Sequence, residues 1–107
     1  MIEKYVALPR TLLGSGEFFI LRASGDSMVD AGIDSEDLVV IRRGFEAQPG
    51  KIVAALVDKE STLKRLDYDK DGERLVLYPE NKDKNYPVIR SNNFSIQGVA
   101  VHVLKVL

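Results

Sequence analysis

Two polar side chains in this sequence could together carry out nucleophilic chemistry. Ser27 follows a glycine turn, Ser24-Gly25-Asp26, and Lys64 lies far downstream in the run Ser61-Thr62-Leu63-Lys64-Arg65. A serine hydroxyl is a weak nucleophile until a base removes its proton, and a neutral lysine amine can be that base. Ser27 is therefore a candidate nucleophile and Lys64 a candidate general base.

Other nucleophilic and metal chemistries have few residues to use. The chain contains no Cys, which excludes a thiol nucleophile, a disulfide framework and a zinc–thiolate site. Its single His is His102, in an apolar run near the C-terminus with no obvious acid beside it. A Ser-His-Asp triad or a His-rich metal site is therefore disfavoured, and we expect neither a metal nor a cofactor.

Each of the two residues also has an ordinary structural interpretation. Ser27 stands three positions before Asp30, a spacing typical of a helix N-cap. The start of a helix would also place free backbone N–H groups beside Ser27, where they could hold an oxyanion. Gly25 would let a substrate backbone approach without meeting a Cβ atom.

Lys64 would ordinarily be a solvated cation on a strand. Thr62, Lys64 and Leu66 share one strand face. If that face points inward, desolvation disfavours the ammonium and lowers the lysine pKa. A shift from about 10.4 to near neutrality is roughly three units, or about 4 kcal/mol, which burial would have to supply.

Short apolar runs separated by turn signals predict the elements that must position these residues. One or two helical turns are predicted from Ser27 to Ala31, ended by Gly32. A hairpin turn is predicted over Asp58–Ser61. The predicted strands are 18–23, 37–42, 51–57, 62–68, 74–78 and 94–107.

This pattern indicates one mainly β domain of antiparallel strands with one short helix after the nucleophile. The last predicted strand is apolar on both faces, since Val99, Val101 and Val103 point one way and Ile96, Ala100 and Leu104 the other. A strand with one wet face would alternate more cleanly. It is therefore predicted to be either a central strand or an edge covered by a second subunit.

Composition excludes several partners. The chain has 107 residues, 45% of them hydrophobic, and a formal net charge of −1 with acids and bases interspersed. No basic footprint for nucleic acid is present. No apolar run approaches the roughly 18 to 20 residues of a membrane span, and no signal peptide is visible. These features predict a soluble, cytoplasmic protein that binds no membrane.

Taken together, the two motifs resemble the self-cleaving domain of LexA-type SOS repressors. The resemblance is carried by Ser24-Gly25-Asp26-Ser27-Met28 and by Lys64 in Thr62-Leu63-Lys64-Arg65. It continues through further segments from Phe18 onward: Gly32-Ile33, Asp37-Leu38-Val39-Val40, Lys51-Ile52-Val53-Ala54-Ala55, Pro79-Glu80-Asn81 and Ile96-Gln97-Gly98-Val99-Ala100-Val101.

The resemblance implies a compact, strongly bent β fold of the LexA/signal-peptidase type that forms a homodimer, here through the C-terminal strand. It implies a serine peptidase in which Ser27 attacks, Lys64 acts as base, and the backbone N–H groups of Asp26 and Ser27 hold the oxyanion. LexA itself favours an apolar residue at the position of Asp26, which does not affect a backbone donor. Gly25 supports the turn.

The resemblance also implies a biological setting. Such domains cut their own linker, usually at an Ala-Gly bond, when RecA filaments stimulate them, and cleavage separates them from a helix-turn-helix DNA-binding domain. Neither that DNA-binding region nor an Ala-Gly bond precedes Ser27 here. We therefore expect an N-terminal arm or linker remnant over residues 1–17 and a peptidase and dimerisation domain over residues 18–107, in a chain that binds DNA only through a missing domain.

Three alternatives stay open at this point. A signal-peptidase-like enzyme uses a similar serine motif but would need a membrane anchor. An UmuD-like DNA polymerase accessory protein shares the domain and has a short N-terminal arm. A non-catalytic β dimerisation module is the alternative in which Ser27 and Lys64 have only structural roles.

Overall fold

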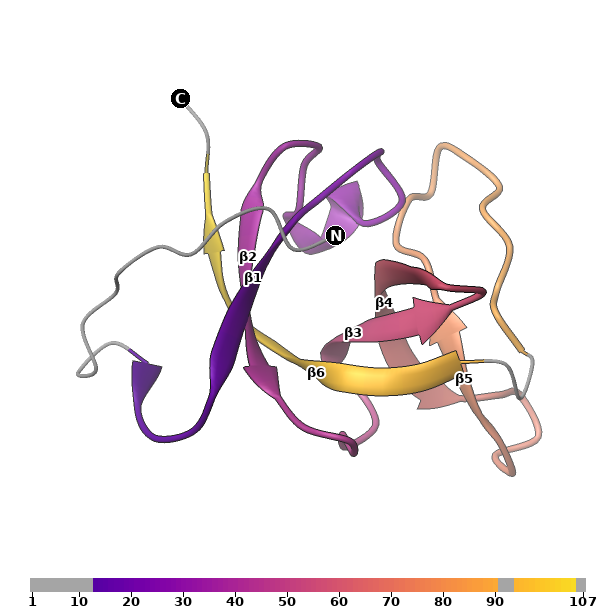
Figure 1. The fold of residues 1–107 in the computed structure, drawn as a ribbon. Coiled ribbons are helices and arrows are strands. Elements are labelled where there is room, and N and C mark those ends of the chain that lie inside the picture. The colour runs from indigo at the N-terminus through magenta and orange to yellow at the C-terminus, as the bar shows by residue number, and fades with distance from the viewer. Residues whose placement is uncertain (1–12, 91–93, 106–107) are drawn as a thin grey trace.

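The computed structural model describes residues 13–90 and 94–105. One 3-10 helix and six strands make up the described part: β1 (Phe18–Arg22), η1 (Val29–Ala31), β2 (Leu38–Arg43), β3 (Ile52–Val57), β4 (Glu60–Tyr68), β5 (Leu75–Tyr78) and β6 (Phe94–Leu104). The strands form one sheet in the order β1-β2-β6-β3-β4-β5 (Figure 1). All neighbouring strands are antiparallel, which confirms the mainly β prediction.

Strand β6 joins the two halves of the sheet and accounts for its bend. Its residues Phe94–Val99 pair with β3, and its residues Gly98–Leu104 pair with β2. The register shifts once against each neighbour, and such bulges bend a strand and increase its twist. Figure 1 shows β6, in yellow, crossing from the half that contains β3–β5 to the half that contains β1 and β2.

Two alternatives were predicted for this strand, a central position or an edge covered by a second subunit, and the structure places β6 between β2 and β3. Its pairing with β3 nevertheless ends at Val99, while its pairing with β2 continues to Leu104. Within the described residues, the far edge of Ala100–Leu104 has no strand partner. The same strand is thus central in its first half and an edge in its second.

Gly98 lies where β6 passes closest to β2. A Cβ atom added there would lie 2.2 Å from the Arg42 carbonyl oxygen and 2.5 Å from Ile41 Cγ2. Real Cβ atoms do not approach a backbone oxygen this closely, so one strand would have to move. The close approach of β6 to its neighbour β2 therefore requires glycine at this position.

We expect Gly98→Ala to lower the free energy of unfolding by at least about 2 kcal/mol, because overpacking against backbone cannot be relieved by a side-chain rotation. Chemical denaturation followed by circular dichroism measures the change. Gly44→Ala is the matched control, since a Cβ there meets only Glu46 O at 3.9 Å. Equal stability of the two variants would contradict the close-approach interpretation.

Two hydrophobic clusters fill the two halves of the fold. The first packs the nucleophile turn onto β1 and β2: Phe19, Leu21, Ala23, Met28, Ile33, Val39, Ile41, Ala54 and Leu63. The second joins β3, β4 and β5: Val53, Ala55, Leu66 and Leu77. Strands β3 and β4 contribute to both clusters, one from each face, so the nucleophile turn packs against the sheet that carries Lys64.

The hairpin between β3 and β4 turns more tightly than predicted. The predicted turn over Asp58–Ser61 is wrong, because Val57 already pairs with Glu60. Asp58 and Lys59 alone make the turn, with φ values of 48° and 71°. Positive φ at both central residues is typical of the two-residue turns whose twist matches a hairpin.

This turn sets the register of β4. Lys64 lies opposite Val53 and Thr62 lies opposite Ala55, and both partners are fully buried. Because directly paired residues share a face, Thr62, Lys64 and Leu66 lie on the face of this half of the sheet that carries the second cluster. A slip of one residue would move Lys64 to the other face.

The remaining strand boundaries agree with the predictions to within one or two residues. The closing strand was predicted over 94–107 and is observed as far as Leu104. Residues 106 and 107 lie outside the described residues. Most of the predicted arm over residues 1–17 also lies outside them. No helix in the described ranges has the length and apolar character needed to cross a membrane.

Candidate active site

The turn that carries Ser27 depends on glycine. Gly25 has a φ of +79°, and a Cβ added there would have no neighbour within 4 Å. Backbone conformation, rather than space, is therefore what restricts this position to glycine. The turn is also held from the other side, because the Gly25 amide donates to Ser35 Oγ at 3.3 Å.

The helix after the nucleophile is shorter than predicted. It is a single 3-10 turn, Val29–Ala31, whose N-cap is Met28, and no side chain caps it. Gly32 ends it in the left-handed conformation with φ 83°, as predicted. The prediction of one short helix after the nucleophile is confirmed, but the helix starts at Val29 rather than at Ser27 and is a single 3-10 turn. The N-cap interpretation of Ser27 is wrong, because the N-cap is Met28. None of its three residues is fully buried, and Ala31 is the helix residue that packs against the first cluster, so little apolar surface favours a longer helix.

The Ser27 hydroxyl instead meets the Lys64 amine. Lys64 Nζ donates to Ser27 Oγ at 3.1 Å and to Thr62 Oγ1 at 2.7 Å. The two hydroxyl groups lie on different elements, the nucleophile turn and β4. The fold thus brings together the two side chains that the sequence analysis paired, at a separation that permits direct proton transfer.

Burial makes the Lys64 amine easier to deprotonate. Desolvation lowers the pKa of Lys64 below the ordinary lysine value of 10.5. No ion pair with a carboxylate opposes this shift within the described part of the chain. A half-buried lysine that contacts only hydroxyl groups is suited to act as a base rather than as a structural cation.

Two backbone donors lie beside the Ser27 hydroxyl. Among the described residues, the Ser27 N–H donates no hydrogen bond to the protein, while the Asp26 N–H lies against its own carboxylate and the Tyr86 hydroxyl. Free amides next to a nucleophile can stabilise negative charge that develops on an attacked carbonyl oxygen. The arrangement therefore places a candidate nucleophile beside a candidate base, with the Ser27 N–H next to them.

The Asp26 carboxylate is occupied elsewhere. It accepts hydrogen bonds from Lys84 Nζ at 2.6 Å and from the Tyr86 hydroxyl. These bonds, the one from Lys84 first, lower the pKa of Asp26. The carboxylate is thus ionised, and its charge is paired with that of Lys84.

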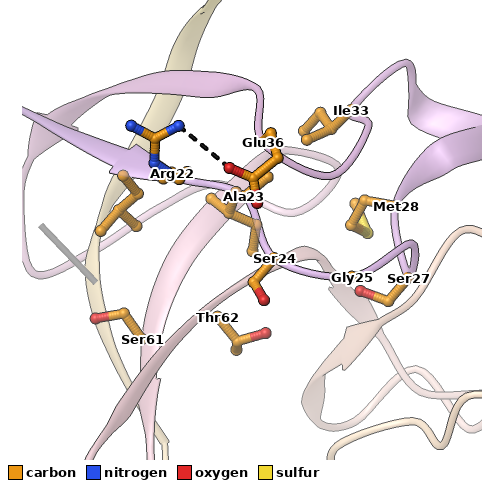
Figure 2. A pocket seen from close by; sticks show the side chains of 12 residues that line it. Arg22, Ala23, Ser24, Gly25, Ser27, Met28, Ile33, Glu36, Ser61 and Thr62 are labelled. Carbon is orange, nitrogen blue, oxygen red and sulfur yellow. Dashed lines mark hydrogen bonds and ion pairs between the residues drawn. The ribbon is translucent and has the colours of Figure 1, made fainter. Parts of the chain in front are cut away.

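A cleft of about 250 Å³ runs past Ser27 between the nucleophile turn and β4. Figure 2 shows Ser24 and Ser27 along one side of it and Ser61 and Thr62 along the other. Apolar side chains line much of the rest, and an ion pair between Arg22 and Glu36 (3.2 Å) lies at one end. The dimensions suit an extended peptide with small side chains near the nucleophile.

Sequence reasoning missed two contributors to this site. Thr62 was placed on the face of Lys64 but not recognised as the acceptor for its amine. The Arg65–Glu80 pair was also missed: Arg65 Nε and Nη2 bind the two Glu80 carboxylate oxygens at 2.5 and 3.1 Å. Only the hydroxyl two positions before Lys64 and the Pro79-Glu80-Asn81 motif could have indicated these roles.

Comparison with known proteins matches residues 1–101 to the family described as Peptidase S24-like. Relatives named LexA repressor are 42% identical over 105 residues in Syntrophotalea carbinolica and 44% identical over 107 residues in Pseudarthrobacter chlorophenolicus. A third, from Pelotomaculum thermopropionicum, is 49% identical over 80 residues.

These matches cover most of this chain but less of each relative. They include 97%, 100% and 75% of the chain and 51%, 41% and 38% of the three relatives. The chain therefore corresponds to about half or less of a protein of that kind. The matched part is the part that contains the Ser27–Lys64 pair.

Proposed function

Because the chain belongs to the Peptidase S24-like family, we propose that it is the C-terminal catalytic and dimerisation domain of a LexA-like repressor, a serine peptidase that cleaves its own linker with Ser27 and Lys64. In this proposal residues 18–107 form the catalytic and dimerisation domain and residues 1–17 are the remnant of the linker. The similarity to LexA repressors favours this function over an UmuD-like polymerase accessory protein or a non-catalytic β module.

One observation carries the catalytic proposal: a half-buried lysine amine lies 3.1 Å from a serine hydroxyl on a glycine turn. A structural lysine would be expected to reach water or a carboxylate. Lys64 instead contacts the hydroxyls of Ser27 and Thr62, and its pKa is lowered by desolvation. These features support a base that is neutral when the site is active.

The reaction follows from this geometry. The neutral Lys64 amine removes the Ser27 hydroxyl proton as Oγ bonds to the carbonyl carbon of the scissile peptide. The resulting oxyanion accepts hydrogen bonds from the Asp26 and Ser27 N–H groups. Lys64 then returns the proton to the leaving amine as the C–N bond breaks. In the second half-reaction Lys64 activates water, which attacks the ester and releases Ser27.

The peptide would bind as an added strand. In the described sheet β1 pairs only with β2, and β5 pairs with β4 only from Arg65 onward, so the edge of Glu60–Lys64 that faces away from β3 has no strand partner. The cleft lies between this edge and the end of β1. Two unpaired edges can hydrogen-bond the backbone of an extended segment on both sides.

A linker graft tests the proposal. A segment with an Ala-Gly bond fused before residue 1 should be cut at that bond, faster at alkaline pH, since Lys64 must be neutral. Mass spectrometry of the products and a rate–pH profile report the result. A graft that stays intact from neutral to alkaline pH while the domain remains folded would refute a peptidase function.

Thr62→Val should slow this cleavage about 10²-fold, because loss of the Oγ1 acceptor lets the Lys64 amine leave its position beside Ser27. Thr62→Ser keeps the hydroxyl and is the control. First-order rates on the grafted chain measure both. A fully active valine variant would remove Thr62 from the mechanism.

A homodimer through β6 is the second part of the proposal. The unpaired edge of Ala100–Leu104 can bond the same edge of a second copy, and Val103, 36% exposed, lies on it. A groove beside this edge is lined by Ile52, Ala100 and Val101 among others. Burial of these residues between two subunits would account for the two apolar faces of the strand.

Val103→Lys should shift the chain to monomers, because an edge lysine opposes strand pairing. Sedimentation velocity over a concentration series measures the assembly. Leu75→Lys, at another exposed apolar position (38%) on β5, should leave the dimer intact. Dimers of unchanged stability with Val103→Lys would place the interface elsewhere.

The remaining partners of the proposal follow from the LexA resemblance. A RecA filament would be the co-effector of cleavage in the SOS response, in the cytoplasm. DNA would be bound by a separate helix-turn-helix domain. No metal or cofactor takes part in the proposed chemistry.

A further inference from the structure

A loop on the outside of the nucleophile turn holds both peptide units that flank Ser27. We call residues 79–86 the strap; it follows β5 and rises beside the nucleophile turn (Figure 1). The Glu80 amide donates to the Ser27 carbonyl at 2.7 Å, and Asn81 Nδ2 donates to the Asp26 carbonyl at 2.8 Å. Residues of the turn and of β4 line the cleft, and no residue of the strap does. The strap therefore binds the turn on the side away from the cleft.

The Asn81 side chain is oriented for this contact. Its Oδ1 accepts the Asp83 amide at 3.0 Å, which leaves Nδ2 to face the nucleophile turn. The contact with Asp26 O is partly buried, so water competes with it less than at an open surface. Asn81 therefore acts as a fixed donor to one backbone carbonyl.

That carbonyl belongs to the same peptide unit as the Ser27 N–H. A trans peptide is planar, and its C=O and N–H point in opposite directions. A donor that fixes the Asp26 carbonyl toward the strap thus directs the Ser27 N–H away from it. Within the described residues this N–H has no acceptor, so a carbonyl oxygen in the cleft could receive it.

We propose that Asn81 is a positioning residue that orients the Ser27 N–H toward the oxyanion, an inference that rests on the proposed peptidase function. Asn81 acts through the Asp26–Ser27 peptide and does not touch the substrate. The Val29 N–H also donates to the Asp26 carbonyl, but at 3.4 Å against 2.8 Å for Asn81. Without the Asn81 donor this longer bond holds the peptide plane less firmly, and the N–H loses its alignment with the oxygen that becomes charged.

The strap is also attached through Glu80, and the Glu80 contacts differ in function from the Asn81 contact. Glu80 binds Arg65 on β4 through both carboxylate oxygens, and its carbonyl accepts the Asp30 amide at 2.8 Å. Arg65 is the neighbour of Lys64. The Glu80 contacts thus hold the nucleophile turn to β4, while Asn81 acts on a single peptide, so an Asn81 substitution should leave the Ser27–Lys64 distance unchanged.

The test uses the unmodified chain and an alkyl fluorophosphonate, whose phosphoryl oxygen mimics the oxyanion when Ser27 Oγ displaces fluoride. Asn81→Asp keeps the size and the Oδ1 acceptor but removes the donor, and Asn81→Ala removes the donor without adding charge. Asp83→Asn makes the same oxygen–nitrogen exchange two positions away and is the control. Labelling of Ser27 is followed by mass spectrometry against probe concentration and pH, with thermal unfolding to confirm folding.

We expect both Asn81 variants to lower the maximal labelling rate at least about tenfold and up to the roughly 10³-fold value of one oxyanion donor. Probe affinity and the pH midpoint set by Lys64 should match those of the wild type, and Asp83→Asn should behave as wild type. Wild-type labelling rates in the Asn81 variants would overturn the role of Asn81 without affecting the peptidase proposal. A shifted pH midpoint would also overturn that role, because it would show that the substitution had moved Lys64. If Ser27→Ala is labelled as fast as the wild type, the peptidase proposal fails with it.

Discussion

Ser27→Ala in the linker-grafted chain is expected to abolish cleavage. The methyl group cannot form the acyl-enzyme, and loss of the nucleophile costs on the order of 10⁶ in kcat in a serine peptidase. No product should therefore accumulate above the uncatalysed background at any pH. Product masses followed over days at alkaline pH measure the residual rate.

Ser24→Ala is the matched control for this substitution. Ser24 lies on the same turn and lines the same cleft, but its hydroxyl is not the one that Lys64 contacts. We expect it to retain most of the activity and the wild-type melting temperature. Continued cleavage by Ser27→Ala, or equal loss in both variants, would contradict the assignment of the nucleophile.

Lys64→Met should have nearly the same effect on cleavage as Ser27→Ala. A general base by itself accelerates a reaction about 10² to 10⁴-fold. When a nucleophile and its base act as a unit, however, removing either one loses most of the acceleration that the pair provides. Methionine keeps much of the side-chain volume, so a packing defect would not explain the loss. The double variant should be no slower than either single variant, which a double-mutant cycle on cleavage rates would test.

Lys51→Met controls for the loss of one positive charge, since Lys51 is an exposed lysine directly before strand β3. Its cleavage rate should match that of the wild type. Should Lys64→Met cut the graft at a rate close to the control, another group must be the base.

The pH dependence of the wild type follows from the direction of the Lys64 shift. Burial lowers the Lys64 pKa below 10.5, so the neutral and active form is populated at a lower pH than for an exposed lysine. The cleavage rate should rise with pH and level off above this lowered pKa. The midpoint of the profile should therefore lie below that of an ordinary lysine.

The same lowering of the Lys64 pKa also predicts how the free energy of unfolding depends on pH. Between the lowered folded pKa and 10.5, the unfolded chain binds a proton that the folded chain has released, so wild-type stability rises with pH over that window. Lys64→Met avoids the cost of a buried ammonium. It should thus be the more stable protein below the folded pKa, by a margin that shrinks as the pH rises towards 10.5.

Local patterns in the sequence were sufficient to predict most of the strands. Runs such as Phe18–Arg22 and Leu38–Arg43 are apolar and β-branched or aromatic, and turn residues separate them. The helix after Ser27 was predicted to be longer than it is, because periodicity over five residues cannot distinguish an α-helical turn from a 3-10 turn. The β3–β4 turn was predicted to be too long, because Asp58-Lys59 is not a common two-residue turn sequence.

The pairing of Ser27 with Lys64 was identified by the resemblance rather than by physics alone. Each residue by itself favours an ordinary role, a cap or a solvated cation. Contacts between residues far apart in the chain cannot be read from local pattern, because they depend on the order and register of the strands between them. Asn81 and Thr62 illustrate this, since both contact the site only through partners set by the fold.

By itself, the sequence determined the β character of the chain, the positions of its strands and the chemical types available to a site without Cys and with one His. These properties depend on side-chain chemistry and on the two-residue period of a strand. Only the tertiary structure decided which face Lys64 occupies, how deeply its amine is buried and which peptide groups surround Ser27. Those properties depend on the register of β4 and on the packing of the strap, where a shift of one residue would separate the amine from the hydroxyl.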